Sequence, residues 1–357
     1  GTLSLTSKQI AEKLDYYGAW LELSSAVNYG FVTLYSLNKY FPYTLAIIAD
    51  MLMNPTFPEK EMEVVIESNR QQLLVNSTRV EVIARKQLNR SLFGVQHPFG
   101  RFAEASDYDR INPEILREFY RKYYHSGNCS VYVSGKVTPE IIRCIEVHLG
   151  DAPWGKTRIM PALQLMDPQP IPEKHVFVEK ADALQSSLKM GGFMMDRTHP
   201  DFLKARIMVT LFGGYFGSRL MSNIREDKGY TYGIGAGIVN CPGSGVLVVT
   251  TEADNQYIDS IIYEVYLEMD RMCNDLAPKE ELEMVRNYML GEMSRSYEGP
   301  FSLSDAWIYI ETAELDDDFF VRSLDAIRSV TSEEIRTLAQ RYFCKEKLIE
   351  VVAGKKV

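Results

Sequence analysis

Two stretches of the chain align without gaps at an offset of 219 residues: Ile111-Asn-Pro-Glu-Ile-Leu-Arg-Glu-Phe-Tyr-Arg-Lys-Tyr-Tyr124 and Val330-Thr-Ser-Glu-Glu-Ile-Arg-Thr-Leu-Ala-Gln-Arg-Tyr-Phe343. The first copy places apolar side chains at helical spacing. After each copy comes a β-branched run, 130–134 or 348–353, that predicts a strand before a glycine-lysine pair. The stretch therefore predicts a helix followed by a strand, present in two copies.

A second block repeats at almost the same distance. Pro58-Glu-Lys-Glu-Met-Glu-Val-Val65 falls on Pro278-Lys-Glu-Glu-Leu-Glu-Met-Val285, at an offset of 220 residues. Two independent blocks that share an offset to within one residue are hard to obtain from composition alone, so we infer an internal duplication. The predicted fold class is α+β, with two tandem duplicated domains, each an antiparallel-rich sheet packed with helices.

The duplication also predicts the domain boundaries. We expect a first α+β repeat over residues 1–152, a proline-rich linker over 153–173 and a second repeat over 174–357. The counterpart of the start of the second repeat would lie about 45 residues before Gly1. The first repeat is therefore expected to lack its N-terminal part in these 357 residues.

Composition excludes some classes of partner. The chain holds 48 acidic and 39 basic residues, a net charge of -9, which argues against binding to nucleic acid or to an anionic membrane surface. No run of eighteen apolar residues predicts a membrane span. We expect a soluble protein with peptide or protein partners, and the compartment, bacterial cytoplasm or periplasm, stays open.

The candidate functional residues lie in the stretch 211–237, which predicts a helix end, a glycine turn, a short helix and a strand of small residues. Arg225 stands seven positions before Tyr232, with Lys228 and Gly229 at the turn between them. A guanidinium and a phenol that converge can donate hydrogen bonds to one carbonyl or anionic group. On its own, an arginine and a tyrosine at this spacing are more often a surface residue and a packed one.

Three segments carry a resemblance to a known family: Gly1-Thr2 through Leu14, Met51-Leu-Met-Asn-Pro-Thr-Phe57 and Ser218-Arg-Leu-Met-Ser-Asn-Ile-Arg-Glu-Asp-Lys-Gly-Tyr-Thr-Tyr232. They resemble the pitrilysin/insulinase-like zinc peptidases, which include the mitochondrial processing peptidase subunits and the core proteins of the respiratory chain. The resemblance implies that the two duplicated domains form a half-clam. It further implies a homo- or heterodimer in which two half-clams enclose a chamber for peptide substrates.

The zinc motif of that family, His-x-x-Glu-His, is not among these residues. The five histidines (97, 125, 148, 175 and 199) all lie more than twenty positions apart. The family's third ligand is the second of two acids seven apart, and counting from Glu61 places Ser68 there, a poor zinc ligand, unless the register slips by one residue to Glu67. We therefore predict no metal ligand in this chain, with zinc held by a partner or by the missing N-terminal segment.

The resemblance assigns roles to residues of the stretch 211–237. Arg225 and Tyr232 match the family's Arg/Tyr pair, which implies that they bind the substrate carbonyl or the oxyanion that develops from it. Tyr230 shares that role or packs inside the domain. Gly233 and Gly235 predict a thin strand with which a peptide backbone can pair.

Three functions remain open at this point. The leading hypothesis is a non-catalytic subunit that supplies the Arg/Tyr pair to a zinc-bearing partner for the hydrolysis of short peptides. The first alternative is a complete zinc metallopeptidase whose motif lies in the missing N-terminal segment. The second is a structural subunit without activity, like the respiratory core proteins, so whether the chain is an enzyme is undecided.

Overall fold

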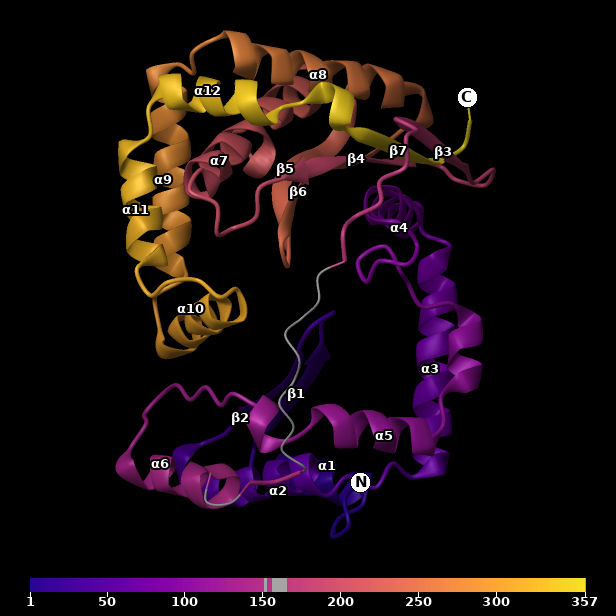
Figure 1. The fold of residues 1–357 in the computed structure, drawn as a ribbon, viewed down its shortest axis with the longest axis vertical. Helices are drawn as coiled ribbons and strands as arrows, with labels where there is room; N and C mark the ends of the chain where they lie inside the picture. The colour runs from indigo at the N-terminus through magenta and orange to yellow at the C-terminus, as the bar shows by residue number, and fades with distance from the viewer. Residues whose placement is uncertain (151–152, 156–165, 357) are drawn as a thin grey trace. The chain divides into compact units, whose positions relative to one another are not determined.

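A computed structural model of the chain describes residues 1–150, 153–155 and 166–356 (Figure 1). The contacts divide the chain into two compact units, residues 1–75 with 103–164 and residues 76–102 with 165–357. Both units combine helices with antiparallel strands. The predicted α+β class is therefore confirmed.

The first unit is built on a two-stranded hairpin. Strand β1 (Trp20–Ser25) pairs antiparallel with β2 (Gly30–Tyr35), so that Trp20 faces Tyr35 and Ser25 faces Gly30. The helices of this unit are α1 (Ser7–Tyr16), α2 (Phe41–Met53), most of α3 (Glu59–Ser77), α5 (Pro113–Tyr123) and α6 (Pro139–Ile145). Its buried cluster is small and centres on Ile10, Leu14 and Ile47.

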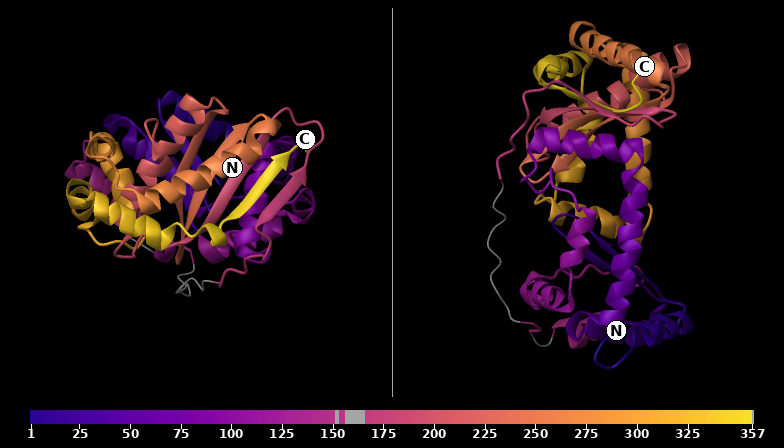
Figure 2. Two further views of the ribbon diagram at one scale, coloured as in Figure 1. Left: turned by 90° about the horizontal axis from the view of Figure 1, so that it is seen from above. Right: turned by 90° about the vertical axis from the view of Figure 1, so that its right-hand side faces the viewer.

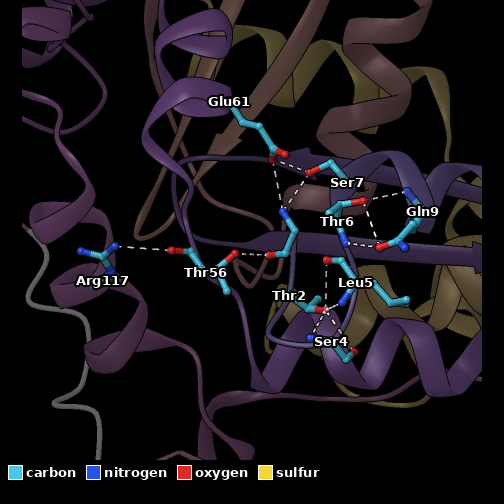
Figure 3. Close-up of polar contacts among 10 residues, drawn as sticks. Thr2, Ser4, Leu5, Thr6, Ser7, Gln9, Thr56, Glu61 and Arg117 are labelled. Carbon is cyan, nitrogen blue, oxygen red and sulfur yellow. Dashed lines mark hydrogen bonds and ion pairs between the residues drawn. The ribbon is translucent and has the colours of Figure 1, made fainter.

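Polar side chains fix the start of α1 (Figure 3). The Thr6 hydroxyl accepts from the Gln9 amide at 3.3 Å, and the Gln9 side chain accepts from the Thr6 amide at 2.9 Å. This reciprocal capping box satisfies two backbone donors at the helix end. The hydroxyl of Ser7 donates to the carboxylate of Glu61, which ties α1 to the beginning of α3.

The second unit contains a five-stranded sheet with the order β3-β7-β4-β6-β5. Its strands are β3 (His175–Glu179), β4 (Ser186–Met194), β5 (Thr231–Cys241), β6 (Ser244–Ala253) and β7 (Ile349–Gly354). Only the β3–β7 pair is parallel. The left view of Figure 2 shows β7, in yellow, between its neighbours. The C-terminal strand therefore closes the sheet against the first strand of the second half.

Helices and helical turns of the second half form the core on one face of this sheet. They are α7 (Phe202–Val209), the π-helical turns η5 (Thr210–Gly214) and η6 (Met221–Asp227), α8 (Ile258–Asn274), α9 (Lys279–Arg295), α11 (Phe319–Ser329) and α12 (Ser332–Tyr342). Helix α10 (Pro300–Thr312) belongs to the same unit, but none of its residues is part of this core cluster. Leu188 and Met190 of β4 are fully buried against this layer. Strand side chains alternate between faces, so Lys189, between these two, points the other way.

The other face of the sheet is covered by α4 (Val80–Phe93), a helix from the first half of the sequence (Figure 1). Leu88 of α4 is 2% exposed. Its Cδ2 atom lies so close to β4 that a Cβ added to Gly191 would be 3.0 Å away from it. Lys189, also of β4, reaches Glu81 of α4 at 3.5 Å. The sheet of the second unit thus takes part of its core from residues 76–102.

The order of elements supports the duplication. In the first half, α1, β1, β2, α2, α3, α4 and α5 follow one another. In the second half, η6, β5, β6, α8, α9, α10 and α12 occur in the same order, with α11 added. Helix and strand types therefore repeat as the two sequence blocks predict, and the expectation of tandem duplicated α+β domains is confirmed.

The strand expected at 130–134 is wrong. These residues are described, but no strand of the described part of the chain pairs with them, and Val131 and Val133 remain exposed. The matching strand β7 forms because β3 and β4 lie on its two sides. A β-branched run without a neighbouring strand has no ladder to join, so it forms no strand.

The boundaries predicted for the two repeats and the linker are statements about the duplication, and they stay predictions. Residues 151–152 and 156–165, and with them part of the linker 153–173, lie outside the described residues. The compact units follow contacts instead, which places residues 76–102 with the second unit.

The docking of α4 predicts a large effect of one substitution. Leu88→Ala should lower the free energy of unfolding by about 2–5 kcal/mol, because it opens a cavity between α4 and the sheet. Val321→Ala in α11, where the side chain is 60% exposed, is the control and should change it by less than about 0.5 kcal/mol. Urea unfolding of both variants measures the difference, and equal effects would contradict the packing of α4 on β4.

A second prediction concerns the stability of the fold at low pH. The Tyr342 hydroxyl and the Arg341 guanidinium each donate a hydrogen bond to Asp201 at 2.6 Å. These hydrogen bonds, of which that from Tyr342 has the larger effect, hold the pKa of Asp201 below its ordinary value. A carboxylate whose pKa is lower in the folded than in the unfolded chain stabilises the fold at pH values above its unfolded pKa, which is about 3.9 for aspartate. This stabilisation is lost as the pH falls through the folded-state pKa. Asp201→Asn should therefore lower the free energy of unfolding at pH 7, and this loss should shrink as the pH falls below the unfolded value. Asp317→Asn, an exposed control, should have little effect at any of these pH values.

Candidate functional site

The segment that carries Arg225 and Tyr232 is held close to the sheet by a glycine. A Cβ on Gly213, in η5, would lie 2.6 Å from the Cβ of Ala236 in β5, a distance that real side chains do not adopt. Only glycine lets the end of the α7–η5 helix approach β5 this closely. The chain then passes Tyr215, whose ring stacks on Tyr288 at 4.9 Å, and enters η6.

Ionic and amide contacts anchor η6 to two helices. Arg219 donates two hydrogen bonds, 2.7 and 2.8 Å long, to the carboxylate of Glu281 in α9. The Asn223 amide donates to Glu264 at 2.9 Å and to Glu268 at 2.8 Å, and both acids are buried in α8. Two-pronged and charge-assisted hydrogen bonds of this kind are directional, so they fix the orientation of η6.

Arg225 contacts an aromatic ring and an acidic residue of its own segment. Its guanidinium lies over the ring of Phe216, with Cζ 4.4 Å from the ring centroid. The nearest charge is the carboxylate of Glu226, the next residue, at 3.9 Å. The Arg225 side chain is 33% exposed and the Phe216 ring is 61% exposed. An ion pair of this length at the surface contributes little, so the charge of Arg225 remains accessible to a ligand.

The turn after η6 requires a left-handed residue. Gly229 has φ +66°, and its amide donates to the carbonyl oxygen of Arg225 at 3.2 Å. Tyr230 then stacks on Tyr257 at 4.9 Å and packs against the core of the unit. Of the two roles left open for Tyr230, packing is what these contacts describe, and a contact with substrate stays a prediction.

A β-bulge exposes Tyr232. The pairing of β5 with β6 shifts register between Thr231 and Ile234. Thr231 and Ile234 are buried, and the Thr231 hydroxyl bonds to Thr251 and to the carbonyl oxygen of Glu252. The two residues between them turn outward, and Tyr232 is 93% exposed without a hydrogen bond to any described residue. Bulges often re-aim a side chain in this way beside active sites.

Strand β5 is an edge of the sheet, since β6 is its only neighbour in the strand order. Nothing lies within 4 Å of the positions that a Cβ would take on Gly233 and Gly237, and the nearest atom to such a position on Gly235 is 3.7 Å away. An edge strand presents unpaired backbone donors and acceptors, and small residues allow another backbone to come close. The geometry can therefore accept an extended peptide.

The structure thus places the five predicted site residues on one anchored segment, from the end of η6 to the first half of β5. Their roles in binding or catalysis are not tested by geometry and stay predictions. The sequence analysis did not single out Phe216 and Asn223. Phe216 stands between two glycine positions, a context that favours an exposed ring, whereas nothing near Asn223 in the sequence reveals its two acidic partners on α8.

The described residues contain no group of three histidine, cysteine, aspartate or glutamate side chains that could hold a metal ion. Glu61, which served as the reference for the third zinc ligand, receives the hydroxyl of Ser7, and this hydrogen bond holds the pKa of Glu61 below its ordinary value (Figure 3). Where zinc would be held therefore stays open. None of the described helices has the length and apolar character needed to cross a membrane.

The positive φ of Gly229 predicts that substitution by alanine has different effects on stability at Gly229 and at Gly237. Gly229→Ala should lower the free energy of unfolding by about 1–2 kcal/mol, because only glycine adopts φ +66° without cost. Gly237→Ala, whose Cβ also meets open space but whose φ is ordinary, should be neutral or slightly stabilising. Thermal unfolding of both variants measures this, and an equal loss in the two would mean that the turn is not the cause.

Comparison with known proteins finds relatives by sequence, among them the following three. A protein of Rickettsia bellii named uncharacterized zinc protease is 26% identical over 84% of this chain and 71% of its own length. A protein of Helicobacter pylori named non-peptidase homolog YmxG is 23% identical over 66% of this chain and 54% of its own. The mitochondrial-processing peptidase subunit alpha-1 of Dictyostelium discoideum is 25% identical over 43% of this chain and 24% of its own.

The fold has solved relatives as well. The crystal structure of a peptidase M16 inactive domain from Pseudomonas fluorescens matches with a TM-score of 0.89 at 19% identity, over all of this chain and 86% of that one. The likeness to this structure confirms the predicted α+β fold, and the sequence relatives named above confirm the resemblance to the zinc-peptidase family. Residues 110–289, half of the chain, match the family described as Peptidase M16 inactive domain. The chain belongs to the Peptidase M16 inactive domain family.

Proposed function

We propose that this chain is a non-catalytic half that binds peptide along β5 and supplies Arg225 and Tyr232 to peptide hydrolysis on a zinc-bearing partner half. One observation carries the proposal. A guanidinium and a phenol, seven residues apart on a segment fastened to the core, are both left without a strong partner inside the unit. Donors that are positioned in advance but uncommitted are what stabilisation of a developing negative charge requires.

The described residues do not fit a zinc site, so the chemistry assigned to this chain is limited to its own groups. An extended peptide adds to the edge of β5 through backbone hydrogen bonds. Arg225 and the Tyr232 hydroxyl then donate to the carbonyl oxygen of the bond to be cleaved. Their hydrogen bonds strengthen as negative charge grows on that oxygen, which lowers the barrier rather than only tightening binding.

The partner is a second half-clam, either another copy of this chain or a different subunit. The names of the relatives support a division of labour within the family. One relative is called a non-peptidase homolog, and another is called a subunit of a processing peptidase. The proposal assigns the activation of water to the partner and the binding of the carbonyl oxygen to this chain.

The test is peptide hydrolysis by the complex purified with its natural partner. Arg225→Ala and Tyr232→Phe should each lower kcat/KM by about ten- to a thousandfold, the usual range for the loss of one such donor. Arg322→Ala and Tyr263→Phe are matched controls, because both side chains are exposed on other helices, and they should leave hydrolysis unchanged.

Two outcomes would contradict the proposal. If hydrolysis is unaffected by both site substitutions, the chain acts as a structural subunit. If the full-length protein alone binds one zinc ion per chain and loses activity on chelation, it is a complete peptidase and needs no catalytic partner.

A further inference from the structure

The second unit contains a pocket that does not include the Arg225–Tyr232 segment. It has a volume of about 600 Å³ and lies among α7, α9, α10 and α11, which Figure 1 shows grouped in this unit. A volume of this size suits a single amino acid or a short peptide end. What the pocket can bind follows from the polar groups that line it.

Arg206 of α7 brings a positive charge to the wall of the pocket. Its Nε atom is buried without a hydrogen-bond partner, and none of the described residues forms an ion pair with its guanidinium. Burial lowers the pKa of Arg206, an effect that the nearby phenols of Tyr309 and Tyr297 oppose. A buried charge without a counter-ion is costly, so the site is suited to an anion.

A second polar group without a hydrogen-bond partner also lines the pocket. Ser323 of α11 is 2% exposed, and its hydroxyl has no hydrogen-bond partner. Native proteins rarely leave a buried hydroxyl unpaired. Together, Ser323 and Arg206 offer a neutral and a charged donor from two facing elements, which is the donor set that a carboxylate accepts.

Aromatic side chains of the lining indicate which side chain of a ligand the pocket favours. Five aromatic rings contribute to the pocket: Tyr288, Tyr297, Tyr309, Phe319 and Phe320. Pairs of these rings already contact each other edge-on or tilted, at 5.0 Å for Tyr297 with Phe320 and 6.0 Å for Tyr309 with Phe319. Such walls favour a further aromatic ring.

Acidic groups complete the lining. Asp305 and Glu292 also face the pocket. Glu292 pairs with Arg295, and Asp305 lies beyond ion-pair distance of Arg206. A carboxylate ligand with an adjacent N–H or ammonium group can therefore be held at both ends. Phosphate, which has no such donor, would meet repulsion from these acids.

We propose that this pocket binds the α-carboxylate of an aromatic amino acid, either free or at the C-terminus of a short peptide. The carboxylate lies against Arg206 and Ser323, the ring lies among the aromatic walls, and the α-nitrogen faces Asp305. The proposal does not depend on hydrolysis or on a partner, because every group that it uses belongs to the second unit.

The test is calorimetric titration of the full chain with four probes: L-phenylalanine, alanyl-phenylalanine and the C-terminal amide of each. The acids should bind, and the amides should bind at least about tenfold more weakly, because a charged hydrogen-bond acceptor is lost. Binding of the dipeptide alone would identify a peptide end as the source, and equal binding of both acids would mean that the terminal residue suffices. No binding by either acid at 10 mM, or equal binding of acids and amides, would overturn the proposal.

Two variants locate the site. Arg206→Met should abolish the preference for acids over amides and should raise the Tm of the unliganded chain, since it removes an unpaired, partly buried charge. Arg322→Met, at an exposed position of α11, is the matched control and should keep the preference. If Arg206→Met does not fold, Ser323→Ala serves instead and should weaken the acids more than the amides. Unchanged binding in a folded Arg206→Met variant would contradict the proposal.

Discussion

The constraint on which the second unit depends is the double burial of β4. Nearly every residue of this central strand is buried, so both faces of the sheet must be covered. The helices of the second half cover Leu188 and Met190, but no helix of that half forms the other core cluster, which α4 supplies. Even the buried Lys189 is satisfied from there, through Glu81. A helix from the first half of the sequence thereby completes the core of the second unit.

The same sheet explains where the candidate site lies. Its central strands are committed on both sides, whereas β5 has a neighbour on one side only, so ligand backbone can be added there without disturbing the core. The contact of Arg219 with Glu281 and those of Asn223 with two buried acids hold η6 rigidly beside that edge. The bulge at Tyr232 then turns one side chain outward from an otherwise regular ladder. Rigidity around an exposed pair is what a site for oriented hydrogen bonds requires.

Much of this could be predicted from the sequence, because helical spacing and a repeated offset are local patterns that survive in a single chain. The duplicated α+β order and the helix–turn–strand around Gly229 followed from them. Interactions between distant residues could not be predicted. Nothing in the segment 130–134 shows that it lacks a neighbouring strand, and nothing in α4 shows that it packs on β4, 100 residues away. The helix at 319–329 was not among the predicted elements.

Arginine pairing distinguishes structural residues of the second unit from candidate binding residues. Arg219 meets a carboxylate at 2.7 Å and Arg341 meets one at 2.6 Å, so each charge is neutralised within the fold. Arg225 and Arg206 lack such partners among the described residues, one beside an edge strand and the other in a pocket. The unit contains acids enough to pair them, since Asp305 lines the same pocket as Arg206. At Arg225 and Arg206, a bound ligand can supply the negative charge that the fold does not bring to them.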